Sequence, residues 1–261
     1  MKLTYNNQTI DLFSEEFFPD GPPERILLNL SGGLDSASLL YLLCKYFPSV
    51  QKHIYTGKAI LTPFDAENAI DIVGWIKTKF PDNNILTHDI IEYDDFSKSV
   101  LDEVHELVKA DPSYYDKYPW VDYGDPQRSM NSFLGKIAKP YVMMKVTKSL
   151  MSKYDCYKYM SAMTQNPPED EMEKHGFLYL SETKRNPNTN QMIMFGTYTY
   201  QPYCKVDKKF VYGVFDEENL MEELFPLTGS CTGSFDSTNG FSEPCKMCFW
   251  CHEKKWAFGK Y

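Results

Sequence analysis

The stretch LLNLSGGLDSASLLYLL, residues 27–43, places SGGLDS between two apolar runs. The first run has the composition of a buried strand, and the second has the length and composition of a helix. Gly32 and Gly33 allow a tight turn between them, because glycine adopts backbone angles that other residues avoid. The stretch therefore predicts a strand, a glycine-rich turn and a helix in direct succession.

A strand–turn–helix unit of this kind is suited to binding anions. The first N–H groups of a helix have no partner within the helix, and the helix dipole adds positive charge there. Ser31 and Ser36 add hydroxyl donors. The stretch matches neither GxxxxGK(S/T) nor GxGxxG, so we expect a phosphate-binding turn of another kind. The alternative is a plain turn that Asp35 or Ser36 caps.

Strands and helices alternate along the first 165 residues. We expect strands at 26–30, 53–63, 83–91 and 156–163, and helices at 36–47, 66–80, 96–110 and 131–151. This order predicts an α/β fold with a doubly wound, mainly parallel sheet that binds ligands at the carboxyl ends of its strands. Loops are expected at 111–129, 164–176 and 181–191, and a short helix at 217–225 that Asp216 caps.

Net charge and hydrophobicity indicate which class of molecule the protein binds. The 261 residues carry a net charge of −9, which argues against direct nucleic-acid binding and favours a small-molecule substrate. The first 13 residues lack the apolar core of a signal peptide. No apolar run approaches the roughly 20 residues that cross a bilayer. We therefore expect a cytoplasmic protein without membrane contact; a homodimer is compatible with the sequence.

Four of the seven cysteines fall within residues 231–251. Cys245, Cys248 and Cys251 form a C-x2-C-x2-C run, and Cys231 precedes it. Cytosolic thiols stay reduced, so the cluster indicates a metal before disulfides, and four thiolates suit a tetrahedral Zn²⁺. The remaining cysteines are expected to be buried apolar residues: Cys44, Cys156 and Cys204.

Three other kinds of cysteine site fit parts of this pattern. Residues 248–252 match CxxCH, the attachment signature of c-type haem. The C-x2-C-x2-C run also opens a ferredoxin-like spacing, although the next ligand of that pattern would fall at Lys255. A redox-active CxxC pair is the third alternative.

The SGGLDS stretch resembles the SGGxDS signature of the PP-loop ATP pyrophosphatases, which have a Rossmann-like fold. These enzymes split ATP between the α and β phosphates, adenylate an oxygen of the substrate and let a nucleophile displace AMP. The resemblance implies that Asp35 and Ser36 are catalytic, with Asp35 placing Mg²⁺ or ordering the turn. It implies that ATP contacts Leu30, Ser31, Gly32, Gly33, Leu34, Asp35 and Ser36.

The C-terminal part is similar to the 7-cyano-7-deazaguanine synthases within that superfamily. Residues 227–231 read LTGSC, the C-x2-C-x2-C run follows, and Lys254 stands where the family usually has arginine. The resemblance implies a PP-loop domain at 1–226 and a four-cysteine segment at 227–261, packed on that domain, in which Zn²⁺ is structural. Lys208 and Lys209 lie in a DKKFV stretch similar to a helix start of the family, so one of them contacts phosphate or both are solvated.

The activity implied is a ligation of nitrogen to carbon. ATP with Mg²⁺ activates 7-carboxy-7-deazaguanine, ammonia gives the amide, and a second activation gives the nitrile. Three stretches depart from the family pattern: residues 55–58, Arg128 with Asn131, and 164–176. A diverged PP-loop enzyme that stops at the amide, or one that thiolates tRNA, therefore stays open, as does a zinc-binding interaction module without activity.

Overall fold

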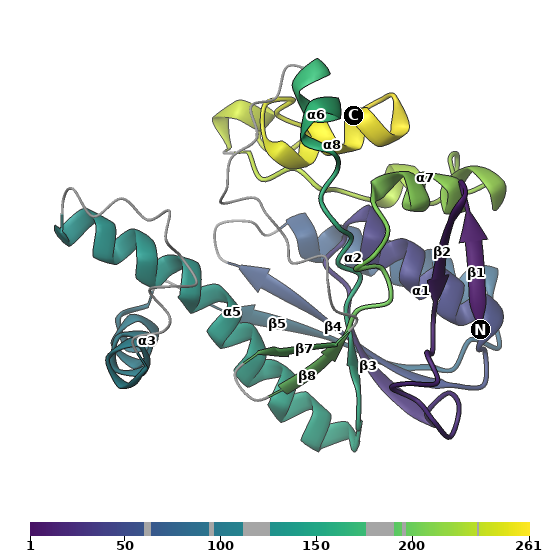
Figure 1. The fold of residues 1–261 in the computed structure, drawn as a ribbon, viewed down its shortest axis with the longest axis horizontal. Helices are drawn as coiled ribbons and strands as arrows, with labels where there is room; N and C mark the ends of the chain where they lie inside the picture. Colours follow the sequence, from purple (N-terminus) through teal and green to yellow (C-terminus); the bar gives the residue numbers. More distant parts are fainter. Residues whose placement is uncertain (60–63, 94–96, 112–125, 176–190, 195–196, 234) are drawn as a thin grey trace.

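A six-stranded sheet forms the centre of the molecule, in the order β5-β4-β3-β6-β8-β7. The computed structural model describes residues 1–59, 64–93, 97–111, 126–175, 191–194, 197–233 and 235–261. The strands of the sheet are β3 (Arg25–Asn29), β4 (Gln51–Ala59), β5 (Ile85–Tyr93), β6 (Tyr159–Met160), β7 (Gln191–Met194) and β8 (Thr197–Tyr200). All are parallel except β7, which pairs antiparallel with β8 at the edge. The predicted α/β fold with a mainly parallel sheet is confirmed (Figure 1).

Helices cover both faces of this sheet. Their bounds are α1 (Leu34–Tyr46), α2 (Phe64–Lys79), α3 (Lys98–Ala110), α5 (Pro126–Tyr154), α6 (Glu169–Lys174), α7 (Lys208–Glu217) and α8 (Phe249–Phe258). Ile26 and Leu28 of β3 belong to the larger core cluster with α1 and α2, whereas Leu27 belongs to a second cluster with Met144 and Leu150 of α5. A strand buried on both faces needs a continuous apolar run, which explains the sequence of β3.

The chain reverses its direction of winding at β3. From β3 it passes through α1 to β4 and through α2 to β5, and it then returns to β6 on the other side of β3. Ligands of open parallel sheets bind at such a switch point, outside the carboxyl ends of the strands. The turn at 31–36 follows β3 directly, so it lies at this point.

Two outer parts complete the fold. An antiparallel hairpin of β1 (Lys2–Tyr5) and β2 (Gln8–Asp11) packs against α7, and α7 packs against α1. Helices α6 and α8 lie together next to α7, where the chain ends (Figure 1). Within the described ranges, no helix combines the length and apolar character that a bilayer crossing requires.

Several predicted elements differ from those in the structure. The strand expected at 156–163 is only the two residues of β6, and the loop expected at 164–176 contains α6. The helix expected at 217–225 is wrong, since α7 begins nine residues earlier at Lys208 and ends at Glu217. The expected loop at 111–129 lies outside the described residues from 112 to 125, and α5 already begins at Pro126. Of the loop expected at 181–191, residues 181–190 lie outside them too.

Candidate functional site

The turn at residues 31–36 is held closed by its own serines. Gly32 has a φ of +75°, which favours glycine, and Gly33 is the residue before the first turn of α1. The Ser36 hydroxyl oxygen accepts a hydrogen bond from the Ser31 N–H at 3.2 Å and donates one to the Gly33 carbonyl at 3.1 Å. Gly33 has no side chain that could cap α1. The N–H groups of the first turn of α1 therefore point toward the carboxyl edge of the sheet without a capping side chain.

The end of β3 is fixed by its neighbour β4. The Leu30 N–H donates to the Tyr55 carbonyl at 2.9 Å, and the Thr56 hydroxyl donates to the Leu30 carbonyl at 2.7 Å. Leu30 and Leu34 are fully buried in the core. Among the residues expected to contact ATP, these two can therefore offer only backbone groups, while their side chains anchor the turn.

A buried lysine faces the turn from α7. Lys208 Nζ lies 2.6 Å from both carboxylate oxygens of Asp35 and 3.5 Å from an oxygen of Glu253. The side chain of Lys208 is 4% exposed, and that of Glu253 is 1% exposed. Buried charges persist only when they are paired, so these three side chains form one electrostatic unit that joins α1, α7 and α8.

The structure distinguishes the two lysines of the DKKFV stretch. Lys209, the next residue, points away from the turn, with Nζ over the ring of Trp256 at 4.5 Å and 3.8 Å from a Glu171 oxygen. Its side chain is 39% exposed. Only Lys208 is in contact with the turn, because the first residues of a helix point in different directions.

The LTGSC segment lies directly against the turn. The Gly229 N–H donates to the Gly32 carbonyl at 3.0 Å. A Cβ on Gly33 would stand 3.4 Å from the Gly229 oxygen, and a Cβ on Gly229 would stand 2.4 Å from Asn68 Nδ2. Glycine at position 229 therefore lets the segment fit between the turn and Asn68 of α2, and the contact with the turn lies two residues before Cys231.

The four clustered cysteines converge on one point. The sulfur atoms of Cys231, Cys245, Cys248 and Cys251 all lie within 4.8 Å of one another, and those of Cys245 and Cys251 are 3.9 Å apart. Four sulfurs about 2.3 Å from a single tetrahedral ion would be about 3.8 Å apart. The cluster can therefore hold one metal ion. As predicted, the other three cysteines are buried: Cys44, Cys156 and Cys204.

Backbone N–H groups and neighbouring thiols prepare these sulfurs as ligands. Burial raises the pKa of Cys231, and the N–H groups of Gly233 and Cys245, which donate to its sulfur at 3.3 and 3.2 Å, partly offset that shift. A hydrogen bond from Cys251 lowers the pKa of Cys248 to about 4 and raises the pKa of Cys251. The thiol that retains a proton would release it to solvent when its sulfur binds a metal ion.

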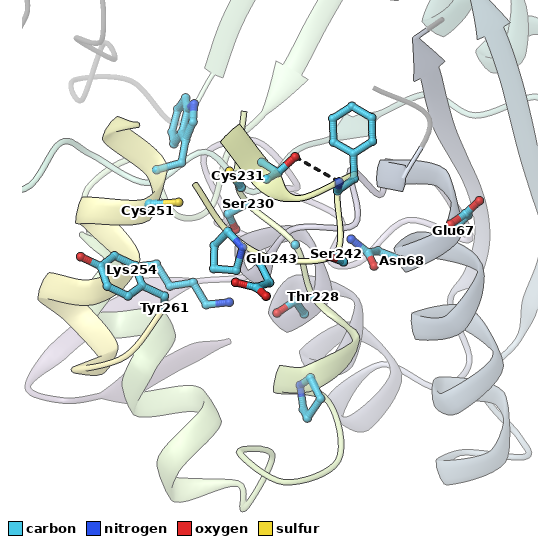
Figure 2. A pocket seen from close by; sticks show the side chains of 16 residues that line it. Glu67, Asn68, Thr228, Ser230, Cys231, Ser242, Glu243, Cys251, Lys254 and Tyr261 are labelled. Atoms are coloured by element: carbon cyan, nitrogen blue, oxygen red, sulfur yellow. Dashed lines mark hydrogen bonds between the residues drawn. The ribbon is translucent and has the colours of Figure 1, made fainter. Parts of the chain in front are cut away.

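A cavity of about 340 Å³ separates the start of α2 from α8 (Figure 2). Glu67 and Asn68 of α2 line one side, and Lys254 and Tyr261 line the opposite side. Burial lowers the pKa of Lys254 to about 8. The segment around Gly229 forms a shared wall, so the cavity lies beside the turn, and no residue of 31–36 is among the described residues that line it.

The SGGLDS turn and the four cysteines of this region carry a signal in the sequence, whereas Glu253 and Asn68 do not. The turn and the cysteines lie where the motifs indicated, and they are neighbours in space. Glu253 and Asn68 were missed, since a single acid or amide on a helix has no distinguishing sequence signal. Arg128 and Asn131 lie in α5, and their side chains are outside the described residues.

Comparison with known proteins finds distant structural similarity only. No protein-family model matches the chain, and no curated protein does. The chain is similar to NMN synthetase from Francisella tularensis, at 11% identity and a TM-score of 0.45, covering 93% of this chain and 87% of that one. It is similar to the glutamine-dependent NAD+ synthetase from Acinetobacter baumannii in complex with ADP, at 16% identity and a TM-score of 0.44, covering 86% of this chain and 35% of that one.

A third similar structure is the U34-tRNA thiolase from Methanococcus maripaludis with its 4Fe-4S cluster. The identity is 12% and the TM-score 0.43, and the match covers 89% of this chain and 64% of the thiolase. This chain thus spans about a third of the length of the A. baumannii enzyme and less than two thirds of the thiolase. These similarities are too distant to assign an activity, so a functional conclusion must rest on the site.

Proposed function

We propose that the protein is an ATP-dependent carbon–nitrogen ligase of the 7-cyano-7-deazaguanine synthase type. The observation that supports this most directly is the turn at 31–36. It opens α1 at the switch point of the sheet and presents helix N–H groups, two serine hydroxyls and the Lys208–Asp35 pair at one place. That combination suits a triphosphate with a bound Mg²⁺.

In this proposal each group of the turn has a separate task. The N–H groups at the start of α1 and the hydroxyls of Ser31 and Ser36 hold the departing pyrophosphate. Lys208 neutralises part of its charge, and the carboxylate of Asp35 is the hard oxygen ligand that Mg²⁺ prefers. Mg²⁺ held there by Asp35 would supply stabilisation of the negative charge that develops on the phosphate oxygens.

The reaction then proceeds by two activations. A carboxylate oxygen of the substrate attacks the α-phosphorus of ATP, and the bond to the β-phosphate oxygen breaks and releases pyrophosphate. Ammonia attacks the acyl carbon, AMP leaves with the activated oxygen, and a proton is lost to give the amide. The amide oxygen attacks a second ATP in the same way, and loss of AMP and two protons leaves the nitrile.

The cavity beside the turn is our candidate for the substrate acid. The cation of Lys254 suits a carboxylate, and Trp250 and Phe241 in the lining offer aromatic faces for a planar ring. Glu67 and Glu243 offer acceptors for a guanine-like edge. A volume of about 340 Å³ lies within the range of small-ligand pockets.

We propose a structural Zn²⁺ for the four cysteines, with residues 227–261 as a segment packed on the ATP-binding domain at 1–226. The sulfur separations support one ion, since in an iron–sulfur cluster the four thiolates bind different irons and spread further apart. Four thiolates complete a tetrahedron, which leaves no open position for catalysis.

The test is a reaction with the candidate acid. Full-length, zinc-loaded protein is incubated with ATP, Mg²⁺, ammonium and 7-carboxy-7-deazaguanine, and products are followed by mass together with pyrophosphate. Amide followed by nitrile is the expected result. Amide alone would indicate the diverged variant, and pyrophosphate release only with tRNA and a sulfur donor would indicate thiolation. Absence of pyrophosphate with every acceptor would contradict the proposed class.

A further inference from the structure

Lys208 lies between two carboxylates from different parts of the chain. Asp35 belongs to the first turn of α1 and contacts Lys208 Nζ with both oxygens at 2.6 Å. Glu253 belongs to α8 and approaches the same nitrogen at 3.5 Å. The side chains of Lys208 and Glu253 are almost closed to water, and that of Asp35 is 20% exposed. One carboxylate would suffice to neutralise the lysine, so the second needs a reason.

Glu253 is placed by the cysteine segment. Cys248 is the residue before α8, Cys251 lies in its first turn, and Glu253 follows two residues later. Helix α8 also packs against α7, which begins with Lys208. The cysteines at the start of α8 and the packing of α8 against α7 thus hold the side chain of Glu253 in position, and it is 1% exposed.

Binding of MgATP would change the partners of Lys208. In the proposed function, Asp35 becomes a ligand of Mg²⁺, so its oxygens can no longer neutralise the lysine fully. The phosphates would take over part of this neutralisation, but a buried cation also needs a fixed counter-ion, because an incompletely neutralised buried charge is disfavoured. A second carboxylate at 3.5 Å allows Asp35 to turn to Mg²⁺ while Lys208 stays charged and directed toward the turn.

We propose that Glu253 is a positioning residue for the ATP site. When Mg²⁺ binds and Asp35 turns toward it, Glu253 replaces Asp35 as the carboxylate that holds Lys208. The inference rests on the proposed function. In this inference the cysteine segment contributes to nucleotide binding as well as to stability, because α8, which the cysteines anchor, carries the carboxylate of Glu253.

The experiment measures binding of α,β-methylene ATP, which cannot be split between its α and β phosphates, with and without Mg²⁺. In Glu253→Gln, Lys208 has only Asp35 as its ionised partner, so Mg²⁺ must compete for that carboxylate. The half-saturating Mg²⁺ concentration should rise about tenfold, as expected when an ionised neighbour at this distance is removed. Binding of the Mg²⁺-free analogue should be unchanged or tighter, because a negative charge near the phosphates is gone.

Two results would overturn the inference. One is an unchanged Mg²⁺ requirement in folded Glu253→Gln with full metal content. The other is an equal loss of affinity with and without Mg²⁺, since a general packing defect has that effect. Glu171→Gln is the matched control, because it removes the carboxylate near the adjacent Lys209, and it should leave the Mg²⁺ requirement as in the wild type.

Asp35→Asn provides a second, independent reading if Glu253→Gln does not fold. Lys208 then keeps Glu253 as its counter-ion, so the Mg²⁺-free analogue should still bind and the stimulation by Mg²⁺ should vanish. Loss of Mg²⁺-free binding in folded Asp35→Asn would show that Glu253 does not hold Lys208. Failure of the wild-type protein to bind the analogue under any condition would instead remove the proposed function, and the inference with it.

Discussion

At the scale of single residues, the site is built from side chains that each satisfy more than one neighbour. Ser36 accepts from the Ser31 N–H and donates to the Gly33 carbonyl, and Ser38 donates to the Asp35 carbonyl at 2.8 Å. The turn is therefore shaped before any ligand arrives. The turn thereby holds the N–H groups at the start of α1 in place, and pre-organised donors are worth more to catalysis than donors that must first be ordered.

The first prediction concerns Asp35 and Ser36. Asp35→Ala removes the proposed Mg²⁺ ligand, and Ser36→Ala removes a donor to the pyrophosphate, so pyrophosphate release should fall by at least about 100-fold in each. Asp35→Ala should stay folded, since Lys208 retains Glu253, and Ser36→Ala should stay folded because it loses hydrogen bonds within the turn only. Asp71→Ala, on the exposed face of α2, is the control. Turnover of Asp35→Ala at the wild-type rate would refute the role of the turn.

At the scale of elements, α7 shows which of two candidate capping residues, Asp207 or Asp216, begins a helix. Asp207 and Asp216 both precede polar and apolar residues suited to a helix. The Asp207 carboxylate accepts from the Lys209 N–H at 2.8 Å and from Gln8 Nε2 at 2.7 Å, and it begins the helix. Asn219, with a φ of +56°, follows where the helix ends.

The second prediction tests this cap. Asp207→Ala should lower the free energy of unfolding by about 1 kcal/mol, because it leaves a backbone donor of α7 without its partner. For a chain of this size that corresponds to a fall in Tm of roughly 2–4 °C. Asp216→Ala is the matched control and should change Tm little, since Asp216 is exposed near the other end of α7. The reverse order of the two Tm values would contradict the assignment.

The third prediction concerns the cysteine segment. Cys248→Ser should lose one equivalent of zinc per chain and make residues 227–261 the first site of proteolysis, because structural zinc contributes on the order of 10 kcal/mol in small sites. Cys156→Ser should keep the metal, since its sulfur bonds the Tyr154 carbonyl away from the cluster. Elemental analysis that finds iron would reject zinc as the metal, and full zinc in Cys248→Ser would reject Cys248 as a ligand.

At the scale of the whole molecule, one carboxylate joins three separate elements. Glu218 accepts hydrogen bonds from Tyr5 of the hairpin at 2.6 Å and Tyr41 of α1 at 2.9 Å, and it pairs with Lys45. Its side chain is 11% exposed. Burial alone would raise the pKa of Glu218, but the bonds from Lys45, Tyr5 and Tyr41 outweigh it and lower the pKa.

The fourth prediction follows from this shift. Because the pKa of Glu218 is lower in the folded than in the unfolded chain, its stabilisation is complete above about pH 4.5 and is lost as the pH falls through the folded value. Glu218→Gln should cost about 2 kcal/mol at pH 7 and less at pH 3, as measured by urea unfolding. An equal cost at both pH values would show that the charge is not involved. Glu217→Gln, which keeps the carboxylate of Glu218, is the control.

The sequence by itself determined the features that depend on a few neighbouring residues. Apolar runs, glycines and caps act within one turn or strand, so the strand–turn–helix at 25–46 and the alternation that gives a parallel sheet were predictable. The cysteine spacing predicted a cluster for the same reason. The strand at β6 was predicted too long, and β7 and β8 were not predicted, because strands this short are defined by their pairing partners.

Only the tertiary structure decided which charged residues meet. Lys208 and Asp35 are 173 residues apart, and nothing in the local sequence of either distinguishes Lys208 from Lys209. The packing of α7 against α1 and α8 selects the lysine, and it brings Glu253 to the same nitrogen. Burial then makes these contacts obligatory, because a charge removed from water needs a partner wherever in the chain that partner lies.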